Sequence, residues 1–404
     1  MIPVAEALQR IVGSFEPLAP EQIALSEALG RVLAEDVVAR RTQPPVAVSA
    51  MDGYAARATD IATVPAVLRQ IGEAPAGGAF EGTVGAGECV RIFTGGPVPD
   101  GADTIVIQED TTVDGESVTV SESNGAGHYI RPAGLDFRAG AVGIEAGRAL
   151  TARDIGLAGA MNHPWLAVRR RPRVAILATG DEVVMPGDPV GPHQIVSSNS
   201  VALAAFVRAC GGAPINLGIA PDRADTLAAM AEGARGADLL ITTGGVSVGD
   251  HDLVRRVLGE QGLDMDFWRI AMRPGKPLMF GRLGDTAVMG LPGNPVSAMV
   301  CALIFLRPAM ARMLGLDEEA EPTVAARLAA PLAENDRRQD YLRARLTRDS
   351  DGSLLAEAFS AQDSSMISLL AHADGLIVRP PHAPAAPAGE RVDVLTFPKG
   401  YLAT

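Results

Sequence analysis

The chain has 404 residues, a hydrophobic fraction of 47% and a formal net charge of −13. This length predicts about three domains, and the hydrophobic fraction is ample to form their cores. A nucleic-acid-binding protein needs a basic face and often aromatic stacking platforms. The negative charge and the aromatic fraction of 4% therefore argue against a nucleic-acid partner.

Nothing in the sequence predicts export or a membrane span. The longest apolar run, Met299–Leu306, is much shorter than the roughly 20 residues that a spanning helix needs. The N-terminus carries Glu6 and no basic leader, so we expect a soluble, cytoplasmic protein. The three cysteines lack metal-ligand spacing and are expected to be buried, reduced thiols.

The N-terminal part of the chain combines short helices with a β-rich module. Apolar residues recur at helical spacing in 3–15 and in Ile23–Leu33, which predicts two helices. From about Val46 to Gly147, short apolar runs alternate with glycine-rich turns, which is typical of an all-β module. Thr151–Gly159 predicts a further helix, which we expect to close back on Ile23–Leu33.

The middle of the chain, from Arg173 to about Gly315, alternates apolar strands with helical segments. This order is typical of a mostly parallel sheet that is covered by helices. A long helix is expected to follow Asn294 and to end near Leu314. The expected strands are Val174–Leu177, Ile215–Gly218 and Leu239–Thr242, and the expected helices are Asn199–Ala209, Arg223–Ala234 and Asp252–Leu258.

The C-terminal part predicts a second β module. Short strands follow Glu321, and an Asp351-Gly352 turn separates Tyr341–Arg348 from Ser353–Phe359. Such a turn between two apolar runs is typical of a β-hairpin.

A second predicted hairpin turns at Leu283-Gly284-Asp285-Thr286 and carries a loop at each outer end. We call Met272–Pro277 the basic loop and Leu291–Pro295 the proline loop. Because antiparallel arms bring their outer ends together, the two loops are expected to lie side by side. Arg273 and Lys276 put two cations beside Gly275, a pattern that indicates a site for a phosphate or another oxyanion.

Three glycine-containing turns directly follow predicted strands: Ala178–Glu182, Thr242–Gly249 and Gly290–Pro295. Ligands of open parallel α/β sheets bind at the carboxyl ends of the strands, so the turns predict a shared cleft. Gly244 and Gly245 would let backbone N–H groups approach a phosphate. The alternative is that these glycines only turn the chain.

Carboxylates accompany these turns. Asp181, Glu182, Asp250 and Asp252 could hold Mg²⁺ between the protein and phosphate oxygens, although Asp250 and Asp252 are equally suited to cap a helix. No P-loop and no GxGxxG motif is present, which weighs against an ordinary ATPase or a dinucleotide-binding protein.

Three unusual turns of the N-terminal β module each expose one acid or hydroxyl. They are Ser49–Ala55, Thr94–Pro99 and Arg131–Asp136. From the residues alone, a structural role and a functional role are equally open for each of them.

An ordered set of motifs within residues 49–297 is far more specific than any one of them. The chain contains SAMDGYA, RIFTGGPVP, RPAGLD, ATGDE, TTGGVSVGDHD, MRPGKP and GLPGNPVS. This set resembles the molybdopterin molybdenumtransferases, the family that includes bacterial MoeA and the E domain of gephyrin. The resemblance implies an enzyme that inserts molybdate into adenylylated molybdopterin with Mg²⁺ and releases AMP and molybdenum cofactor. It also implies a homodimer whose composite active site draws on both subunits.

The resemblance implies a multidomain α/β fold. Its central, mostly parallel sheet would be of the molybdopterin-binding type, with an inserted all-β module, a small helical and β segment and a C-terminal β-barrel-like domain. The corresponding divisions are 1–45 with 140–168 for the N-terminal helices and linking domain, 46–139 for the all-β module, 169–318 for the molybdopterin-binding domain and 319–404 for the C-terminal domain.

The roles that the resemblance implies fall into four groups. The catalytic group is Asp52, Thr94, Asp136, Glu182 and Asp252, of which the first three would face the cleft of the other subunit. The substrate-binding group is Thr179, Gly180, Asp181, Asn199, Gly244, Gly245, Ser247, Gly249, Pro292, Gly293, Asn294 and Pro295. The molybdate-binding group is Arg273, Lys276, Arg343 and Ser364, and the Mg²⁺ ligands are Glu182, Asp250 and Asp252.

Two positions depart from the family pattern. Arg273 stands where the family often has lysine, and Ser197-Ser198 precede Asn199 where the family often has aspartate. Two other functions stay open: a molybdopterin adenylyltransferase, which would share the α/β core but lack both β modules, and a non-catalytic scaffold of the same fold. A molybdopterin adenylyltransferase and molybdoenzyme maturation proteins are the partner proteins that the resemblance implies.

Overall fold

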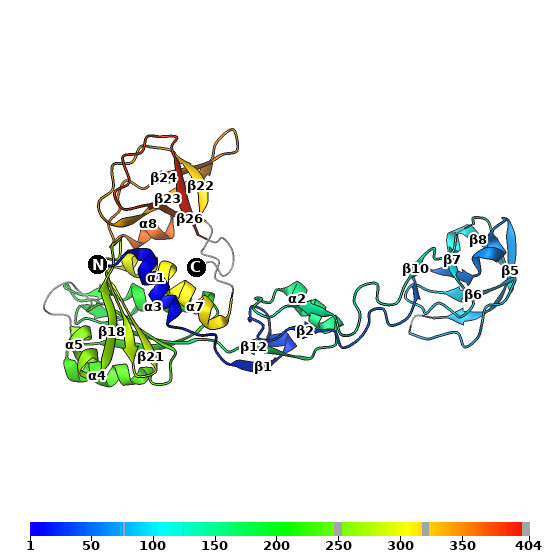
Figure 1. The fold of residues 1–404 in the computed structure, drawn as a ribbon, viewed down its shortest axis with the longest axis horizontal. Coiled ribbons are helices and arrows are strands. Elements are labelled where there is room, and N and C mark those ends of the chain that lie inside the picture. The colour runs from blue at the N-terminus through cyan, green and yellow to red at the C-terminus, as the bar shows by residue number, and fades with distance from the viewer. Residues whose placement is uncertain (76, 124, 246–252, 317–322, 398–404) are drawn as a thin grey trace. The chain divides into compact units, whose positions relative to one another are not determined.

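The computed structural model describes residues 1–75, 77–123, 125–245, 253–316 and 323–397. Two compact units make up the chain (Figure 1). The first, which we call the α/β unit, consists of Met1–Glu21, Gly30–Ala34 and Val168–Thr404. The second, which we call the β unit, consists of Gln22–Leu29 and Glu35–Ala167.

A six-stranded sheet in the order β16-β13-β17-β21-β20-β18 forms the centre of the α/β unit. The first four strands are parallel, and β20 and β18 run antiparallel to their neighbours, so the predicted mostly parallel sheet is confirmed. Its strands are β13 (Arg173–Thr179), β16 (Ala213–Ala220), β17 (Leu239–Thr243), β18 (Leu263–Arg269), β20 (Pro277–Leu283) and β21 (Thr286–Leu291).

Helices cover both faces of this sheet because its buried strands carry apolar side chains on both sides. Val174 and Ile176 contribute to one core, whereas Ala175 and Leu177 contribute to the other, as the alternation of side chains along a strand requires. The first core contains residues of α1 (Val4–Gly13), α3 (Ser198–Ala209), α6 (Pro295–Cys301), the π-helical segment Ala302–Leu306 and α7 (Arg307–Leu314). The second contains residues of α4 (Ala224–Ala231), the 3₁₀ helix Glu232–Ala234 and α5 (Leu253–Glu260).

The continuous helix Pro295–Leu314 is the one described helix that is long and apolar enough to cross a membrane. However, 67% of its most apolar window is buried inside the protein. Phe305 and Ala309 have no exposed surface and pack in the first core of the sheet. This helix is therefore a core helix, and its predicted course from Asn294 to Leu314 is confirmed.

The C-terminal strands of the α/β unit close into a barrel. They follow the order β23-β24-β22-β26-β25, and β25 also pairs with β23. The barrel and the predicted β23–β24 hairpin are thus confirmed. The elements are β22 (Val324–Leu328), β23 (Gln339–Arg348), β24 (Leu354–Ala358), α8 (Ile367–Ala371), β25 (Gly375–Arg379) and β26 (Arg391–Thr396), with β19 (Met272–Arg273) added beside β23.

The β unit is built on a second six-stranded sheet, in the order β7-β4-β6-β5-β9-β8, which confirms the predicted all-β module. Its strands are β4 (Gly53–Ala56), β5 (Ala66–Ala74), β6 (Glu88–Ile92), β7 (Thr104–Ile107), β8 (Thr111–Asp114) and β9 (Ser117–Val120). Two short pairs accompany it: β2 (Val37–Val38) with β11 (Val142–Ile144), and β3 (Val48–Ser49) with β10 (Ile130–Arg131). Its short helices are the 3₁₀ helices Leu25–Glu27, Ala58–Ile61 and Gln108–Asp110 and the α-helix α2 (Ala152–Ala160).

The helix predicted over Ile23–Leu33 is wrong. The segment begins in β1 (Pro20–Ala24), which pairs with β12 (Trp165–Arg169), and continues as the 3₁₀ helix Leu25–Glu27. Pairing with β12 supplies the backbone hydrogen bonds that a helix would otherwise make, and it overrides the helical spacing of the apolar residues. The predicted helix near Thr151 is confirmed as α2, which contacts the 3₁₀ helix and starts with a Thr151–Asp154 capping box.

The division of the chain into four domains is finer than the two units and stays a prediction. A small parallel pair, β14 (Val183–Val184) with β15 (Ile195–Val196), follows β13 in the α/β unit. Asp252, where the helix over Asp252–Leu258 was expected to begin, lies outside the described residues, and α5 is described from Leu253.

Candidate functional site

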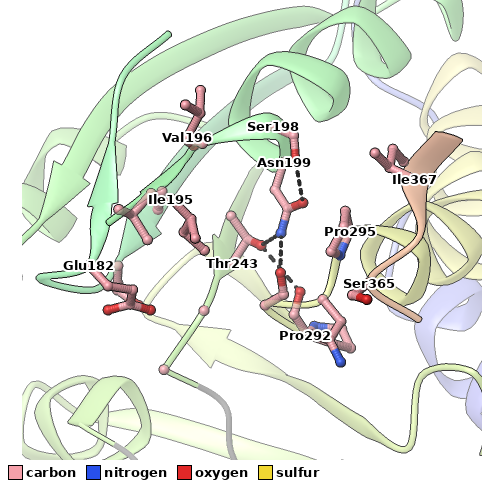
Figure 2. Close-up of a pocket in the computed structure, with 18 of the residues that line it drawn as sticks. Glu182, Ile195, Val196, Ser198, Asn199, Thr243, Pro292, Pro295, Ser365 and Ile367 are labelled. Atoms are coloured by element: carbon pink, nitrogen blue, oxygen red, sulfur yellow. Dashed lines mark hydrogen bonds between the residues drawn. The ribbon is translucent and has the colours of Figure 1, made fainter. Parts of the chain in front are cut away.

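A cavity of about 710 Å³ lies at the carboxyl ends of β13, β17 and β21 (Figure 2). The parallel register pairs Ala178 with Thr243 and Thr243 with Leu291, so the three strands end at the same edge. The structure therefore brings the predicted turns Ala178–Glu182 and Gly290–Pro295 together with residues 242–245, the described part of the third turn. The cavity is lined by Ala178, Thr179, Glu182, Val183, Ile195, Val196, Ser197, Ser198, Asn199, Thr243, Gly244, Gly245, Pro277, Pro292, Gly293, Asn294, Pro295, Ser365 and Ile367.

Asn199 joins the turns after β17 and β21. Its side-chain amide is buried and donates to the Thr243 hydroxyl and to the Gly293 carbonyl, both at 2.8 Å (Figure 2). The Thr243 hydroxyl in turn donates to the Pro292 carbonyl at 3.3 Å. These bonds form a connected network, two of them fully buried, which links the two turns across the cavity.

The departure at Ser197 has a local structural explanation. Ser197 immediately precedes α3, and its hydroxyl lies 2.8 Å from the hydroxyl of Ser200 in the first turn of that helix. Both side chains are buried. The two hydroxyls thus satisfy each other at the start of α3.

The turn after β17 packs directly on Thr179. Gly244 and Gly245 have φ angles of +88° and +65°, which favour glycine. A Cβ on Gly244 would lie 2.6 Å from the Thr179 carbonyl oxygen, and one on Gly245 would lie 2.8 Å from the Thr179 hydroxyl. Only glycine fits at either position, and this explains the glycine pair better than turn formation alone.

The Thr179 hydroxyl is buried and has no hydrogen-bond partner within the described part of the chain. A buried polar group without a partner costs about 1–3 kcal/mol. A ligand that accepts or donates a hydrogen bond at this point would recover that cost. Thr179 belongs to the ATGDE motif, so the sequence indicates it as a candidate. Only the structure shows that its hydroxyl has no hydrogen-bond partner among the described residues.

Glu182 is the one carboxylate among the described lining residues. A Cβ on Gly180, whose φ is +132°, would approach the Glu182 carboxylate to 2.7 Å, so this glycine leaves room for it. Asp181 instead accepts a hydrogen bond from the Asp222 backbone N–H at 3.0 Å and does not line the cavity. The predicted site residues Ser247, Gly249, Asp250 and Asp252 lie outside the described residues.

The C-terminal barrel contributes one wall of the cavity. The Asn294 amide donates to the Ser364 hydroxyl at 2.8 Å, and the Val296 N–H donates to the Ser364 carbonyl at 3.0 Å. The neighbouring Ser365 and Ile367 line the cavity (Figure 2). Sequence reasoning assigned a site role to neither, because their position depends on contacts between the barrel and the proline loop.

Arg343 lies buried behind this wall, with 1% of its surface exposed. Its guanidinium donates to the Gln362 side chain at 3.1 Å and to the Asp363 carbonyl at 2.8 Å. Burial lowers the pKa of Arg343. Its Nη2 has no hydrogen-bond partner among residues that the structure describes. This donor is therefore available to a ligand that binds beside residues 362–366.

The predicted hairpin between the two loops is confirmed. Leu283 pairs with Thr286, and Gly284 adopts a φ of +59° in the turn. At the other end, Pro277 of the basic loop lines the same cavity as the proline loop, so the two loops meet as predicted. The cations themselves do not line the cavity: Arg273 pairs with Asp340 of the barrel, and Lys276 is half-buried.

In the β unit, the structure joins two of the predicted catalytic residues. One Asp52 carboxylate oxygen accepts hydrogen bonds from the Thr94 N–H at 2.7 Å and from the Thr94 hydroxyl at 2.8 Å. These two bonds, in that order, lower the pKa of Asp52 and keep it ionised. A Cβ on Gly53 would lie 1.9 Å from the Val106 carbonyl oxygen, so this glycine lets β4 approach β7 and fixes the residue before it.

Asp136 lies beside the same turn. It lines a second cavity, of about 760 Å³, together with Gly95, Pro97, Arg41 and Arg131. Gly95 directly follows Thr94. The three predicted acidic and hydroxyl residues of the β unit thus gather around the Thr94–Pro97 turn.

Three models of known protein families match different parts of the chain. A model described as a probable molybdopterin binding domain matches residues 175–312, which contain the central sheet and the first cavity. Models of the MoeA N-terminal region (domain I and II) and of the MoeA C-terminal region (domain IV) match residues 2–161 and 325–397. Fold and site thus define a molybdopterin-binding α/β protein with two additional β-rich regions.

Full-length relatives specify the class further. The chain is 36% identical to molybdopterin molybdenumtransferase 2 of Mycobacterium tuberculosis, over 96% of this chain and 97% of that protein. It is 32% identical to the molybdopterin molybdenumtransferase of Bacillus subtilis, over 98% and 94%. A crystal structure of the molybdopterin biosynthesis MoeA protein of Pyrococcus horikoshii superimposes with a TM-score of 0.87 at 30% identity, covering 99% of this chain and 100% of that one. The chain belongs to the MoeA family of molybdopterin molybdenumtransferases, enzymes of molybdenum cofactor biosynthesis.

The Asp52–Thr94 contact predicts a measurable change in acidity. Thr94→Val removes the hydroxyl donor but keeps the backbone donor, so the pKa of Asp52 should rise part of the way to its ordinary value. A lowered folded-state pKa adds stability above the unfolded-state pKa, and this stability disappears as the pH falls through the folded value. The Thr94→Val variant should therefore lose part of the stability that the lowered pKa of Asp52 provides.

Carboxyl ¹³C NMR titration of the β-unit aspartates measures this pKa. Thr112→Val, on the exposed face of β8, is the matched control and should leave the pKa of Asp52 unchanged. An Asp52 pKa in Thr94→Val that equals the wild-type value would show that the hydroxyl does not stabilise the carboxylate.

Proposed function

We propose that the chain inserts molybdate into adenylylated molybdopterin and releases AMP and finished molybdenum cofactor. The observation that carries this proposal is the cavity at the carboxyl edge of the sheet, with its glycine turn and an unsatisfied Thr179 hydroxyl, in a MoeA-family chain. Attack of water on a phosphorus atom of the substrate's phosphoanhydride would form one P–O bond while the bridging P–O bond breaks. This releases AMP and leaves molybdopterin with its own phosphate. The dithiolene sulfurs of the pterin then bind molybdenum, so no protein thiolate is needed.

The substrate would lie across the three turns. Thr179, Gly244 and Gly245 would contact its phosphates, because backbone N–H groups beside glycine and a free hydroxyl suit phosphate oxygens. Asn199 and the proline loop would shape the pterin end, where Pro292, Asn294 and Pro295 line the cavity. Gly180, Asp181 and Gly293 would act by shaping the turns.

Molybdate is a substrate oxyanion and requires cationic and hydrogen-bonding donors. We place it between the basic loop, which carries Arg273 and Lys276, and the barrel residues Arg343 and Ser364. Ser364 contacts Asn294 of the proline loop, and Arg343 has an unsatisfied buried donor. The anion would therefore lie beside the pterin end of the cavity.

The residues present fit a Mg²⁺ ion. The described residues contain no group of three or more histidine, cysteine, aspartate or glutamate side chains that could hold a metal. Mg²⁺ does not need such a group, since it keeps several waters and binds through one or two carboxylates and substrate phosphates. Glu182 would hold it from the cavity wall, and the roles of Asp250 and Asp252 stay predictions. When bound, Mg²⁺ would offset the negative charge of the phosphoanhydride.

We further propose a homodimer in which Asp52, Thr94 and Asp136 of one subunit complete the cavity of the other. Support comes from the arrangement of these residues around one exposed turn, where they do not contribute to the core of the β unit. An ionised Asp52 could accept a proton or order a water at the reacting phosphate. The cytoplasmic location and the partner proteins expected from the sequence stay predictions.

The two other functions fit less well. A molybdopterin adenylyltransferase would lack the β modules, and this chain contains both, each matched by a MoeA region model. A non-catalytic scaffold would not need a buried cavity hydroxyl that has no partner among the described residues, as Thr179 has.

Thr179→Val tests the substrate-binding role of the hydroxyl. One lost hydrogen bond of about 1.4 kcal/mol should weaken binding of adenylylated molybdopterin about 10-fold in isothermal titration calorimetry. The free energy of unfolding should not fall, because no described partner loses a bond. Thr242→Val is a matched control: its hydroxyl is also buried and unsatisfied, but it does not line the cavity. Equal affinity in the two variants would exclude the role of Thr179.

Mixed dimers test the composite site and the reaction together. Asp52→Asn and Glu182→Gln homodimers should each release less than a hundredth of the AMP that the wild type releases from adenylylated molybdopterin, Mg²⁺ and molybdate. In a heterodimer of the two variants, one of the two composite sites contains neither substitution, so activity should return to about half of the wild-type level. A heterodimer as inactive as its parents would place Asp52 and Glu182 in the same chain's site, and a strictly monomeric active species would exclude the composite site altogether.

A further inference from the structure

We propose that Asp340 of the C-terminal barrel positions the basic loop through Arg273, and that Lys276 is the cation of this loop that meets the anion. This inference rests on the proposed function, since it divides the work of the two cations in the proposed molybdate site. It adds a residue, Asp340, to which the sequence analysis assigns no role.

Carboxylates of the barrel surround the Arg273 guanidinium. Its Nε donates to Asp340 Oδ1 at 2.5 Å, and its Nη2 donates to the other oxygen of the same carboxylate. Nη2 also donates to the Asn335 side-chain oxygen at 3.2 Å, and Nη1 lies 3.5 Å from an Asp336 carboxylate oxygen. The positive charge of Arg273 is therefore offset chiefly by Asp340, because Asp336 pairs more closely with Arg338, at 2.9 Å. This pairing weakens the attraction of Arg273 for another anion.

Asp340 is suited to a fixed, positioning role because it is buried. Only 4% of its side chain is exposed, and Arg273 is the ion-pair partner that the structure gives it. A buried carboxylate without its cation is strongly unfavourable, so the pair holds together more firmly than an exposed one. The neighbouring backbone supports it: β19 pairs with β23, with Arg273 opposite Asp340, and the Gln339 N–H donates to the Ala271 carbonyl at 2.9 Å.

The other side of the basic loop is fixed by the helix that follows the proline loop. Gly275 has a φ of +110°, and a Cβ there would lie 2.6 Å from the Cys301 sulfur of α6. The Ile270 N–H donates to the Lys276 carbonyl at 3.1 Å, which closes the loop on itself. The loop is thus held between α6 and the barrel, and the position of Lys276 depends on both.

Lys276 has the free charge that an anion requires. Its side chain forms no hydrogen bond or ion pair with any residue that the structure describes. It directly precedes Pro277, which lines the cavity. Strand β23 carries Arg343 as well as Asp340, so one barrel strand holds both the basic loop and the 362–366 segment in place.

The contact with Asp340 explains why this chain has arginine at position 273, where the family often has lysine. An ammonium group cannot form two parallel hydrogen bonds to one carboxylate, whereas a guanidinium can. Lysine at this position would keep the charge but lose the second bond to Asp340. We therefore expect Arg273→Lys to impair this chain although lysine is frequent at this position in the family.

The test measures the molybdate dependence of AMP release in the full-length enzyme. In Asp340→Asn and in Arg273→Lys, the KM for molybdate should rise about 10-fold while kcat changes by less than about 3-fold, because the loop is displaced but the reacting groups are intact. The double variant should be no worse than the poorer single variant, since both changes break the same contact. Lys276→Ala should raise the KM for molybdate without lowering the urea midpoint of unfolding.

Asp351→Asn is the matched control, because Asp351 belongs to the same barrel but forms an exposed pair with Arg327. Its KM, kcat and unfolding midpoint should equal those of the wild type. A lower KM for molybdate in Asp340→Asn would mean that freed Arg273 binds the anion directly, and additive effects of the two changes would mean that they act separately. Either result overturns the inference.

A second readout separates this inference from the proposed function. The urea midpoints of the wild type, the two single variants and the double variant form a cycle that needs no substrate. If the wild type releases no AMP with molybdate, the proposed function is wrong, and the division of labour between the two cations falls with it. Non-additive midpoints would then still establish that Asp340 holds the loop, and additive midpoints would refute that too.

Discussion

The parallel pairing of β13, β17 and β21 is the constraint on which the site depends. Parallel strands in register end at the same edge of a sheet, and each must be followed by a turn there. Hence the ATGDE and GLPGNPVS segments and residues 242–245 of the TTGGVSVGDHD segment are brought together although up to about a hundred residues separate them. The chemistry of the cavity depends on what these turns carry, whereas their position at one edge of the sheet follows from the backbone pairing of the strands.

The polar groups around the cavity are of two kinds. Some belong to a connected hydrogen-bond network, and others have a buried atom without a partner in the described chain. Asn199, Thr243 and the proline loop form a closed hydrogen-bond network that sets the distance between two turns. Beside it, Thr179 and Arg343 each keep one buried polar atom without a partner in the described chain. Such atoms lower the stability of the empty protein and increase its affinity for a ligand that can satisfy them. Arg273 is the opposite case: its charge is already offset by Asp340, so it adds little affinity for an anionic ligand.

Structural features that depend on residues close together in the sequence were predicted well. The Gly284-Asp285 turn predicted the hairpin, and the hairpin geometry predicted that the basic and proline loops meet. Alternating strands and helices predicted the central sheet. The ordered motifs, read as a family resemblance, led to the fold and to the MoeA assignment, which the family models and full-length relatives confirm.

Features that depend on distant partners were not predicted. The sequence indicates Arg273 as a molybdate-binding cation, but it does not show the pairing with Asp340, which lies 67 residues further along in another module. Ser365 and Ile367 line the cavity only because the barrel contacts the proline loop. The helix expected over Ile23–Leu33 failed for the same reason: β12, far along the chain, provides the pairing that makes its first residues a strand.

Hydrogen–deuterium exchange with adenylylated molybdopterin, in the absence of molybdate, tests the central claim most directly. If the carboxyl edge of the sheet binds the substrate, amides in 178–183, 243–245 and 291–295 should become protected. Amides near Arg235 and Gly284, which line a separate cavity of about 340 Å³ where β17 and β21 begin, should exchange as before. Protection near Arg235 and Gly284 without protection of the three turns would contradict the account.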